Sequence, residues 1–140
     1  MKKHSTEIRV RYAETDKMGV VYHSNYFIWF EVGRNEFFRR NGISYRELED
    51  MGIIFPVINC ASDFIRPARY DDIVTITTWI KEIQGIRVNL AYTAEVGHVL
   101  LAKGETTHVF ASDEGRLVRM GKEFPDVWAA LIQLWKSTEE

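Results

Sequence analysis

The sequence predicts an α+β domain in which one long buried helix lies across one face of a curled antiparallel sheet of about five strands. Residues 26–40 have a helical pattern that is apolar on nearly every side, which is typical of a buried helix. Alternating polar and apolar residues then recur almost to the end of the chain. A chain of 140 residues is expected to form one domain, here residues 1–140.

The strands are predicted from this alternation. Residues 6–13 come first, with Ile8, Val10 and Tyr12 expected to face inward. Further strands are expected at residues 55–66, 73–83, 86–96, 99–111 and 116–120. The short links between them contain glycine, which is typical of hairpin turns, so we expect antiparallel pairing.

The central helix is predicted over residues 26–40, with Asn25 as a plausible N-cap. Gly33 lies in its middle and costs about 1 kcal/mol of helix stability against alanine, which indicates a close approach of the helix backbone to something flat. Ala102 and Gly104 share one face of a later strand and leave a shallow groove there. We expect the helix to lie in such a groove.

Composition limits the classes of function. The 18 basic and 20 acidic side chains give a formal charge of −2, so no nucleic-acid partner is expected. Cys60 is the single cysteine; it excludes an internal disulfide framework, fits a reducing compartment and is expected to be a buried, inert thiol. His4, His98 and His108 share no ligand spacing, so no metal site is expected. No apolar stretch approaches the roughly 20 residues of a membrane span, so a cytoplasmic protein without a membrane span is expected.

The residues that suggest chemistry lie in the turn before the central helix. Asp16 follows a strand end and precedes a loop turned at Gly19, so its carboxylate can project into a cleft. It could attack a carbonyl directly or hold a water molecule as general base. Backbone N–H groups around His23, Ser24 and Asn25, at the positive end of the helix dipole, could stabilise the developing oxyanion.

Each of these residues also has a structural interpretation. Asp16 could bond its own loop as a turn residue, and the His23 imidazole could satisfy a neighbouring carbonyl. Tyr22 and Tyr26 are expected to be core and pocket wall rather than acid catalysts. Asn25 could help to hold the attacking water, but capping is the simpler explanation.

Two motifs resemble those of one enzyme family. The run Thr15-Asp16-x-x-Gly19-x-Val21-Tyr22-His23-x-x-Tyr26, followed by Phe30-Glu31-x-x-Arg34, resembles the signature of the 4-hydroxybenzoyl-CoA thioesterase family of hot-dog-fold acyl-CoA hydrolases. The segment from Ile65 to Asp72 resembles the family's link between its second and third strands. The resemblance covers residues 6–122, and His23 makes the chain more similar to the subgroup that includes the Tol-Pal-associated thioesterase.

The resemblance implies hydrolysis of an acyl-CoA thioester to a free acid and CoA, without a cofactor. It implies that Asp16 is the essential carboxylate and that the N–H of His23 polarises the thioester carbonyl; in the subgroup the matching histidine side chain is also implicated in catalysis. The expected substrate-binding residues are Gly19, Tyr22, Ser24, Asn25, Tyr26 and Arg87. Arg87, with Arg116, Arg119 and Lys122, is a candidate for the CoA phosphates.

The resemblance also implies a homodimer in which two sheets pair edge to edge, or a homotetramer built from two such dimers. Glu31 and Arg34 are expected to be structural, paired with each other or with the partner subunit. Two alternatives stay open. One is a hot-dog hydratase or dehydratase that uses His23 with an acid such as Glu31 or Glu36, and the other is a non-catalytic acyl-CoA-binding protein.

Overall fold

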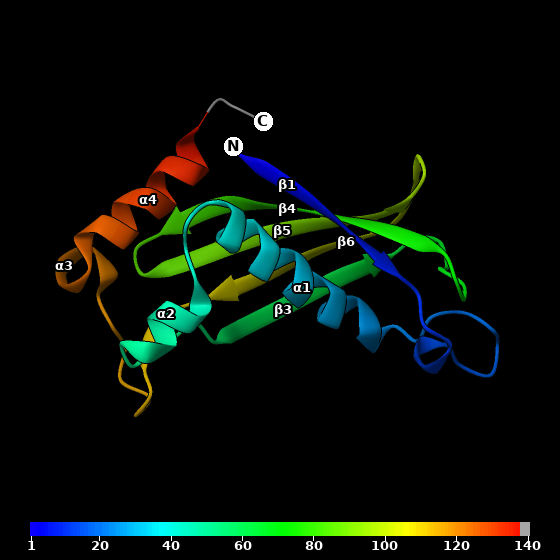
Figure 1. Ribbon diagram of the computed structural model, residues 1–140, viewed down its shortest axis with the longest axis horizontal. Coiled ribbons are helices and arrows are strands. Elements are labelled where there is room, and N and C mark those ends of the chain that lie inside the picture. The colour runs from blue at the N-terminus through cyan, green and yellow to red at the C-terminus, as the bar shows by residue number, and fades with distance from the viewer. Residues whose placement is uncertain (138–140) are drawn as a thin grey trace.

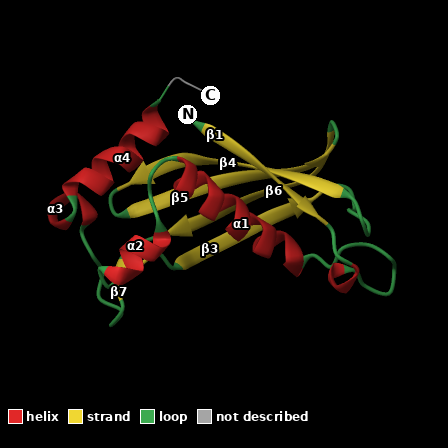
Figure 2. Cartoon of the chain, viewed as in Figure 1, coloured by secondary structure: helices red, strands yellow, loops and turns green. Residues whose placement is uncertain are grey.

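The computed structural model describes residues 1–137 and has a five-stranded antiparallel sheet with the long helix α1 against one face (Figure 1). The sheet order is β1-β4-β5-β6-β3, with β1 (Lys3–Arg9), β3 (Val57–Phe64), β4 (Ile73–Gln84), β5 (Arg87–Val96) and β6 (Val99–His108). The short strands β2 (Ile53–Ile54) and β7 (Ala111–Ser112) pair separately. The helices are α1 (Ser24–Arg40), α2 (Tyr45–Asp50), α3 (Met120–Glu123) and α4 (Pro125–Lys136) (Figure 2). The predicted α+β arrangement is confirmed.

The first strand is shorter than predicted. It ends at Arg9, after which Val10 is buried as expected but Tyr12 is 78% exposed. The prediction that Tyr12 faces inward is therefore wrong, because the chain leaves the sheet and turns through a short 3-10 helix, η1 (Tyr12–Glu14). This early turn places the polar loop at the end of the sheet where α1 begins (Figure 1).

The later strands follow the alternation, with two corrections. The segment 55–66 contributes β3, which is shorter than predicted. The segment 116–120 is not a strand, because it forms one isolated bridge between Leu117 and Ala111 and then enters α3 at Met120. The alternation expected over residues 86–96 is found in β5, where Val88, Leu90, Tyr92 and Ala94 are buried.

Two glycines let α1 lie close to the sheet. A Cβ atom on Gly33 would lie 2.6 Å from Ile76 Cγ2 and 2.7 Å from Thr78 Oγ1, both on β4. A Cβ atom on Gly104 of β6 would overlap the ring of Phe30, which α1 directs into the groove. Both expectations of close approach are confirmed, and they set the position of α1 across the sheet.

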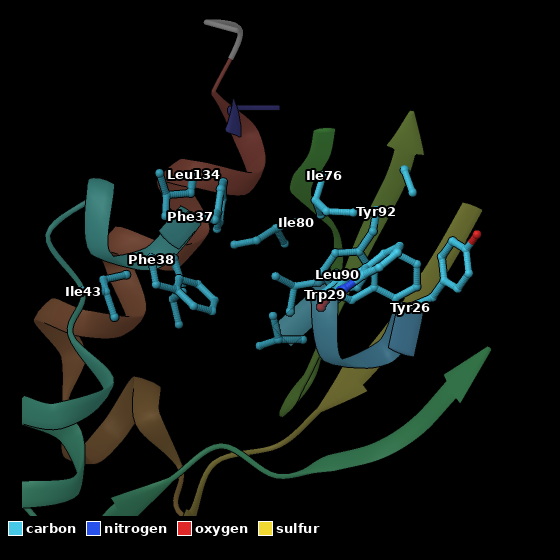
Figure 3. Packing of buried hydrophobic residues seen from close by; sticks show 14 of the residues in the cluster. Tyr26, Trp29, Phe37, Phe38, Ile43, Ile76, Ile80, Leu90, Tyr92 and Leu134 are labelled. Carbon is cyan, nitrogen blue, oxygen red and sulfur yellow. The ribbon is translucent and has the colours of Figure 1, made fainter. Parts of the chain in front are cut away.

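The core lies between α1 and the sheet, and α4 closes one end of it (Figure 3). Its largest fully buried side chains include Trp29, Phe30, Phe37, Ile76, Ile80, Leu90 and Tyr92. Burial of each such side chain contributes about 1.5–3 kcal/mol. Among the described residues, no helix combines the length and the apolar character needed to cross a membrane.

Strand β3 forms one edge of the sheet and is exposed along most of its length. Val57, Ile58 and Phe64 are apolar and 45–46% exposed. Cys60 is exposed as well, so the expectation of a buried thiol is wrong. Its place at the edge of the sheet leaves these side chains uncovered within one protomer.

Candidate functional site

The polar loop before α1 is a narrow hairpin. The N–H of Asp16 donates to the carbonyl of Val20 at 2.9 Å, and the N–H of Tyr22 donates to the carbonyl of Glu14 at 2.9 Å. Gly19 has a φ of 78°, the left-handed conformation that glycine adopts without strain. The hairpin therefore holds Asp16 and the start of α1 in one connected unit.

Asp16 is partly buried, and its two carboxyl oxygens have different surroundings. Oδ1 accepts hydrogen bonds from the N–H of Met18 at 2.8 Å and, at 3.4 Å, from the N–H of Val20. Oδ2 has no hydrogen-bond partner among residues 1–137. One oxygen thus stabilises the loop, as the structural interpretation predicts, while the other is free to bind a ligand or a water molecule.

The start of α1 presents unpaired donors. Helix α1 begins at Ser24 and His23 occupies the N-cap position without a side-chain cap. Within residues 1–137 the backbone N–H groups of His23 and Ser24 have no acceptor, whereas the N–H of Asn25 donates to the carbonyl of Tyr22 at 3.0 Å. Unpaired N–H groups at a helix start, with the positive end of the helix dipole, form an anion site.

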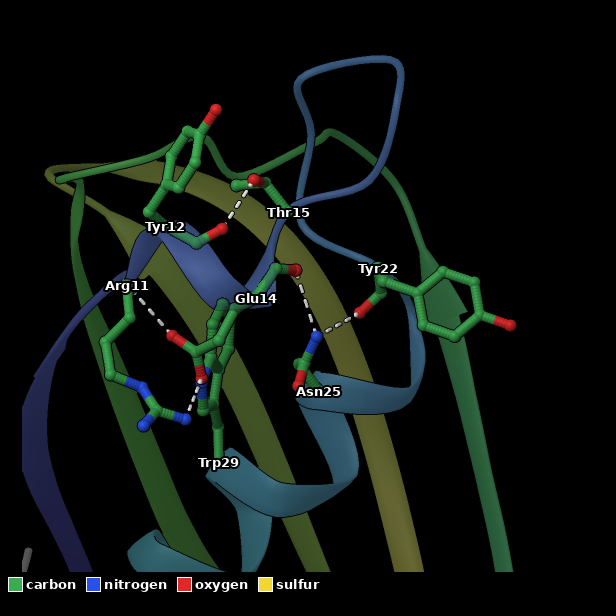
Figure 4. Close-up of polar contacts among 7 residues, drawn as sticks. All are labelled: Arg11, Tyr12, Glu14, Thr15, Tyr22, Asn25 and Trp29. Atoms are coloured by element: carbon green, nitrogen blue, oxygen red, sulfur yellow. Dashed lines mark hydrogen bonds and ion pairs between the residues drawn. The ribbon is translucent and has the colours of Figure 1, made fainter.

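Asn25 has a role other than the predicted one. Because α1 begins at Ser24, two residues earlier than predicted, Asn25 lies in its first turn and is not the N-cap. Its side-chain amide donates to the carbonyls of Glu14 at 3.0 Å and Tyr22 at 3.2 Å (Figure 4). The side chain thus connects the helix to the loop.

A pocket of about 220 Å³ opens at the helix start, lined by Val20, Val21, His23, Tyr26, Phe64, Ile65, Arg66 and Pro67. The ring of Phe64 contacts those of His23 and Tyr26 edge-on, with centroids 5.9 and 5.2 Å apart. The Tyr26 hydroxyl accepts the N–H of Ala68 at 3.3 Å, and burial raises the pKa of this tyrosine. Tyr26 is thus a pocket wall, while Asp16 belongs to the adjacent hairpin and is not among the lining residues.

Glu14 is a buried residue of this region to which no function was assigned from the sequence. It is 4% exposed, and its side chain lies between Arg11 and the indole of Trp29 (Figure 4). A carboxylate in a polar turn is usually solvated. The sequence signal for a buried Glu14 is Trp29 on the buried face of the next helix, because a buried indole N–H needs an acceptor.

The basic residues proposed for CoA phosphates lie elsewhere. Arg87 pairs with Gln84 at the β4–β5 hairpin, beside a pocket of about 270 Å³ that Arg119, Lys122 and Trp128 help to line. This hairpin and α3 are at the opposite end of the sheet from the start of α1 (Figure 1). Within one protomer the structure therefore brings together Asp16, Gly19, Tyr22, His23, Ser24, Asn25 and Tyr26 but not Arg87.

A buried polar chain lies deeper under α1. Arg34 is 7% exposed and donates to the hydroxyl of Tyr92 at 3.0 Å, whereas Glu31 is exposed and forms no ion pair within residues 1–137. The Tyr92 and Thr106 hydroxyls lie 2.5 Å apart, and Nε2 of His108 lies 2.8 Å from Thr106 Oγ1. Burial, and then the Arg34 guanidinium, lower the pKa of His108 to about 3. This histidine is therefore neutral in the folded protein near neutral pH.

The comparisons with known proteins agree with this geometry. A sequence profile of the Thioesterase-like superfamily matches residues 10–132. The Bacillus subtilis protein YneP is 34% identical over 122 residues, which cover 86% of this chain and 88% of that protein. 4-Hydroxybenzoyl-CoA thioesterase from Pseudomonas sp. is 30% identical over 121 residues, 79% of this chain and 84% of that enzyme. A crystal structure of DHNA-CoA thioesterase from Staphylococcus aureus superposes with a TM-score of 0.91 at 34% identity and covers 95% of this chain and 91% of that one.

The fold is therefore the hot-dog fold, and the protein is an enzyme of the thioester hydrolase class. The chain belongs to the Thioesterase-like superfamily, which confirms the family predicted from the two sequence motifs.

Proposed function

We propose that the protein hydrolyses an acyl-CoA thioester to a free carboxylic acid and CoA, with Asp16 and the start of α1 acting on the same carbonyl group. One observation supports this most strongly: Asp16 Oδ2 and the N–H groups of His23 and Ser24, which lie on one hydrogen-bonded hairpin and the helix start that follows it, all lack partners within residues 1–137. The relatives named as 4-hydroxybenzoyl-CoA and DHNA-CoA thioesterases support a CoA thioester as the substrate.

The helix start supplies the electrostatic part of the reaction. As the carbonyl carbon is attacked, its oxygen becomes an oxyanion, which the free N–H groups of His23 and Ser24 can bind. One such donor typically lowers the barrier by about 3 kcal/mol. The donors are part of the backbone at the start of α1, so they need no rearrangement during the reaction.

Asp16 supplies the acid–base or nucleophilic part. As general base, its carboxylate takes a proton from water while the water oxygen bonds to the carbonyl carbon, and the C–S bond then breaks. As nucleophile, it bonds to the carbon itself, CoA leaves, and water hydrolyses the resulting mixed anhydride. In both routes CoA departs as a thiolate with a pKa of about 8.5, so no strong general acid is required.

The surrounding residues position the substrate. Gly19 and Tyr22 leave the hairpin open to the substrate, since Gly19 has no side chain and the ring of Tyr22 is half exposed. Tyr26 and Phe64 form an aromatic wall of the pocket for the group beside the thioester. Arg87 reaches the substrate only if a second subunit brings its β4–β5 hairpin to the site.

We also propose that the protein is a homodimer joined through β3. This strand has an unpaired edge within residues 1–137 and exposes Ile58 and Phe64, and α1 exposes Ile28 and Val32 at 53% and 40%. Pairing of β3 with its copy would cover an edge that single subunits otherwise leave open to aggregation. Because Phe64 also lines the pocket, each site would then lie at the subunit junction.

A substrate panel tests the reaction class. The wild-type protein is assayed for thiol release on short aliphatic, long aliphatic and aromatic acyl-CoA esters, and for hydration of an enoyl-CoA. We expect thiol release on at least one ester and no hydration. Hydration without thiol release would support the dehydratase alternative, and saturable binding without either reaction would support a binding protein.

Two substitutions at one position test the role of the backbone donor. His23 has a φ of −56°, which proline can adopt, so His23→Pro removes the N–H while His23→Ala keeps it. We expect His23→Pro to have a kcat about 100-fold below that of His23→Ala. Equal kcat values would show that this N–H does not bind the oxyanion. The difference between His23→Ala and the wild type measures the contribution of the imidazole.

A further inference from the structure

We propose that Glu14 is a positioning residue, whose buried side chain fixes the Asp16 hairpin against the start of α1. The inference rests on the proposed role of Asp16 in catalysis. Glu14 does not touch the substrate in this account. It acts by keeping Asp16 Oδ2 and the free N–H groups of α1 at a constant separation.

Both carboxyl oxygens of Glu14 are used. Oε1 accepts the backbone N–H of Arg11 at 2.8 Å, and Oε2 accepts the indole N–H of Trp29 at 2.9 Å (Figure 4). The Arg11 guanidinium lies 3.7 Å from Oε2 and forms an ion pair with it at the exposed side. Trp29 is 1% exposed on the second turn of α1, so one carboxyl group bridges the segment that follows β1 and the buried face of the helix.

The backbone carbonyl of Glu14 connects the same residue to the far side of the hairpin and to the first turn of α1. Its carbonyl accepts the N–H of Tyr22 at 2.9 Å and the side-chain amide of Asn25 at 3.0 Å. Residue 14 is thus bonded to the segment before the hairpin, the segment after it, and the helix. Asp16 is two residues away, inside the loop that these bonds close.

The chemistry of the contacts requires a carboxylate at this position. Two N–H donors converge on the side chain, and a carboxylate offers an acceptor oxygen to each. A glutamine offers one acceptor and one N–H₂ donor, so in either orientation the N–H of Arg11 or that of Trp29 faces another donor. Glu14→Gln therefore breaks one bond of the bridge with little change in side-chain volume.

A double-mutant cycle with Asp16 is the test. We expect Glu14→Gln to lower kcat by about tenfold or more on the best acyl-CoA ester, with KM within about threefold, because the reacting groups are misplaced rather than lost. In the Asp16→Asn background we expect the same change to alter the residual kcat by less than about twofold. A residue needed only for folding would lower kcat by the same factor in both backgrounds, and that result, or an unchanged kcat in the wild-type background, would overturn the proposal.

Trp29→Phe is a milder second variant for the case that Glu14→Gln folds poorly, and it should lower kcat in the same direction. Its matched control is Trp135→Phe in α4. This change removes the hydrogen bond of 3.1 Å from the Trp135 indole N–H to the Lys81 carbonyl. We expect the control to leave kcat unchanged; an equal loss in both variants would overturn the proposal.

The proposed function can fail independently of this inference. If Asp16→Asn alone keeps the wild-type rate, the catalytic role of Asp16 fails. Amide hydrogen exchange over residues 15–22 then decides the positioning role: faster exchange in Glu14→Gln, but not in Trp135→Phe, supports it, and unchanged exchange overturns it.

Discussion

Acid is expected to destabilise the folded chain through His108, the last member of the polar chain under α1. A carbonyl can only accept, so Nδ1–H donates to the Phe55 carbonyl at 3.2 Å, and Nε2 accepts from the Thr106 hydroxyl. Burial, together with the Arg34 guanidinium, lowers the pKa of His108 from 6.5 to about 3. Between pH 6.5 and about pH 3 the His108 ring is therefore neutral in the folded chain and becomes charged when the chain unfolds.

The sign of the effect follows from proton binding. Between pH 6.5 and about pH 3 the unfolded chain binds more protons at His108 than the folded chain, so the free energy of unfolding falls as the pH falls through this window. One pKa unit corresponds to about 1.36 kcal/mol. Lowering the pH from 6.5 to about 4.5 should therefore remove about 2 kcal/mol through this residue alone.

Urea unfolding of the wild type and His108→Asn at the two pH values measures this contribution, at one protein concentration so that association does not shift the midpoint. His108→Asn keeps a donor toward Phe55 but cannot become charged. The wild type should lose about 2 kcal/mol more than the variant between the two conditions. The matched control, His98→Asn in the exposed β5–β6 turn, should keep the wild-type difference. Equal losses in the wild type and His108→Asn would refute the reasoning.

Two further predictions concern packing and assembly. Gly104→Ala places a methyl group against the ring of Phe30 and should destabilise the fold by about 1–3 kcal/mol, measured by denaturant unfolding; an unchanged free energy of unfolding would contradict the close approach of α1. Ile58→Lys places a charge on the exposed edge strand and should convert dimer to monomer in light scattering. Val99→Lys, at the first residue of β6 and with similar exposure, should not. A wild-type monomer would contradict the proposed β3 interface.

The parts of the fold that could be predicted depend on local patterns. Three features could be predicted because each depends on how one element packs against a buried face. They are the apolar character of α1 on nearly every side, the glycine at residue 33 and the alternation of β5. Each is found in the structure. The reaction class could be predicted because its motif is continuous in sequence, from Thr15 to Tyr26.

The parts that could not be predicted depend on which elements become neighbours. Alternation does not give strand order, so the sequence predicts a buried Cys60, although β3 lies at the edge of the sheet and exposes this residue. The burial of Glu14 depends on the indole of Trp29, fifteen residues away, reaching its carboxyl group. Arg87 looked compatible with a phosphate site by charge alone, yet its strand begins at the remote end of the sheet.

The central claim is that the Asp16 carboxylate and the start of α1 act together on one thioester carbonyl. The most direct measurement is kcat for Asp16→Asn on the best acyl-CoA ester, with the Kd of that ester measured separately and Asp126→Asn as a control for the loss of one negative charge far from the site. We expect kcat to fall by about 100-fold or more for Asp16→Asn, with Kd within about threefold, and no change for Asp126→Asn. A kcat for Asp16→Asn within twofold of the wild type would contradict the account.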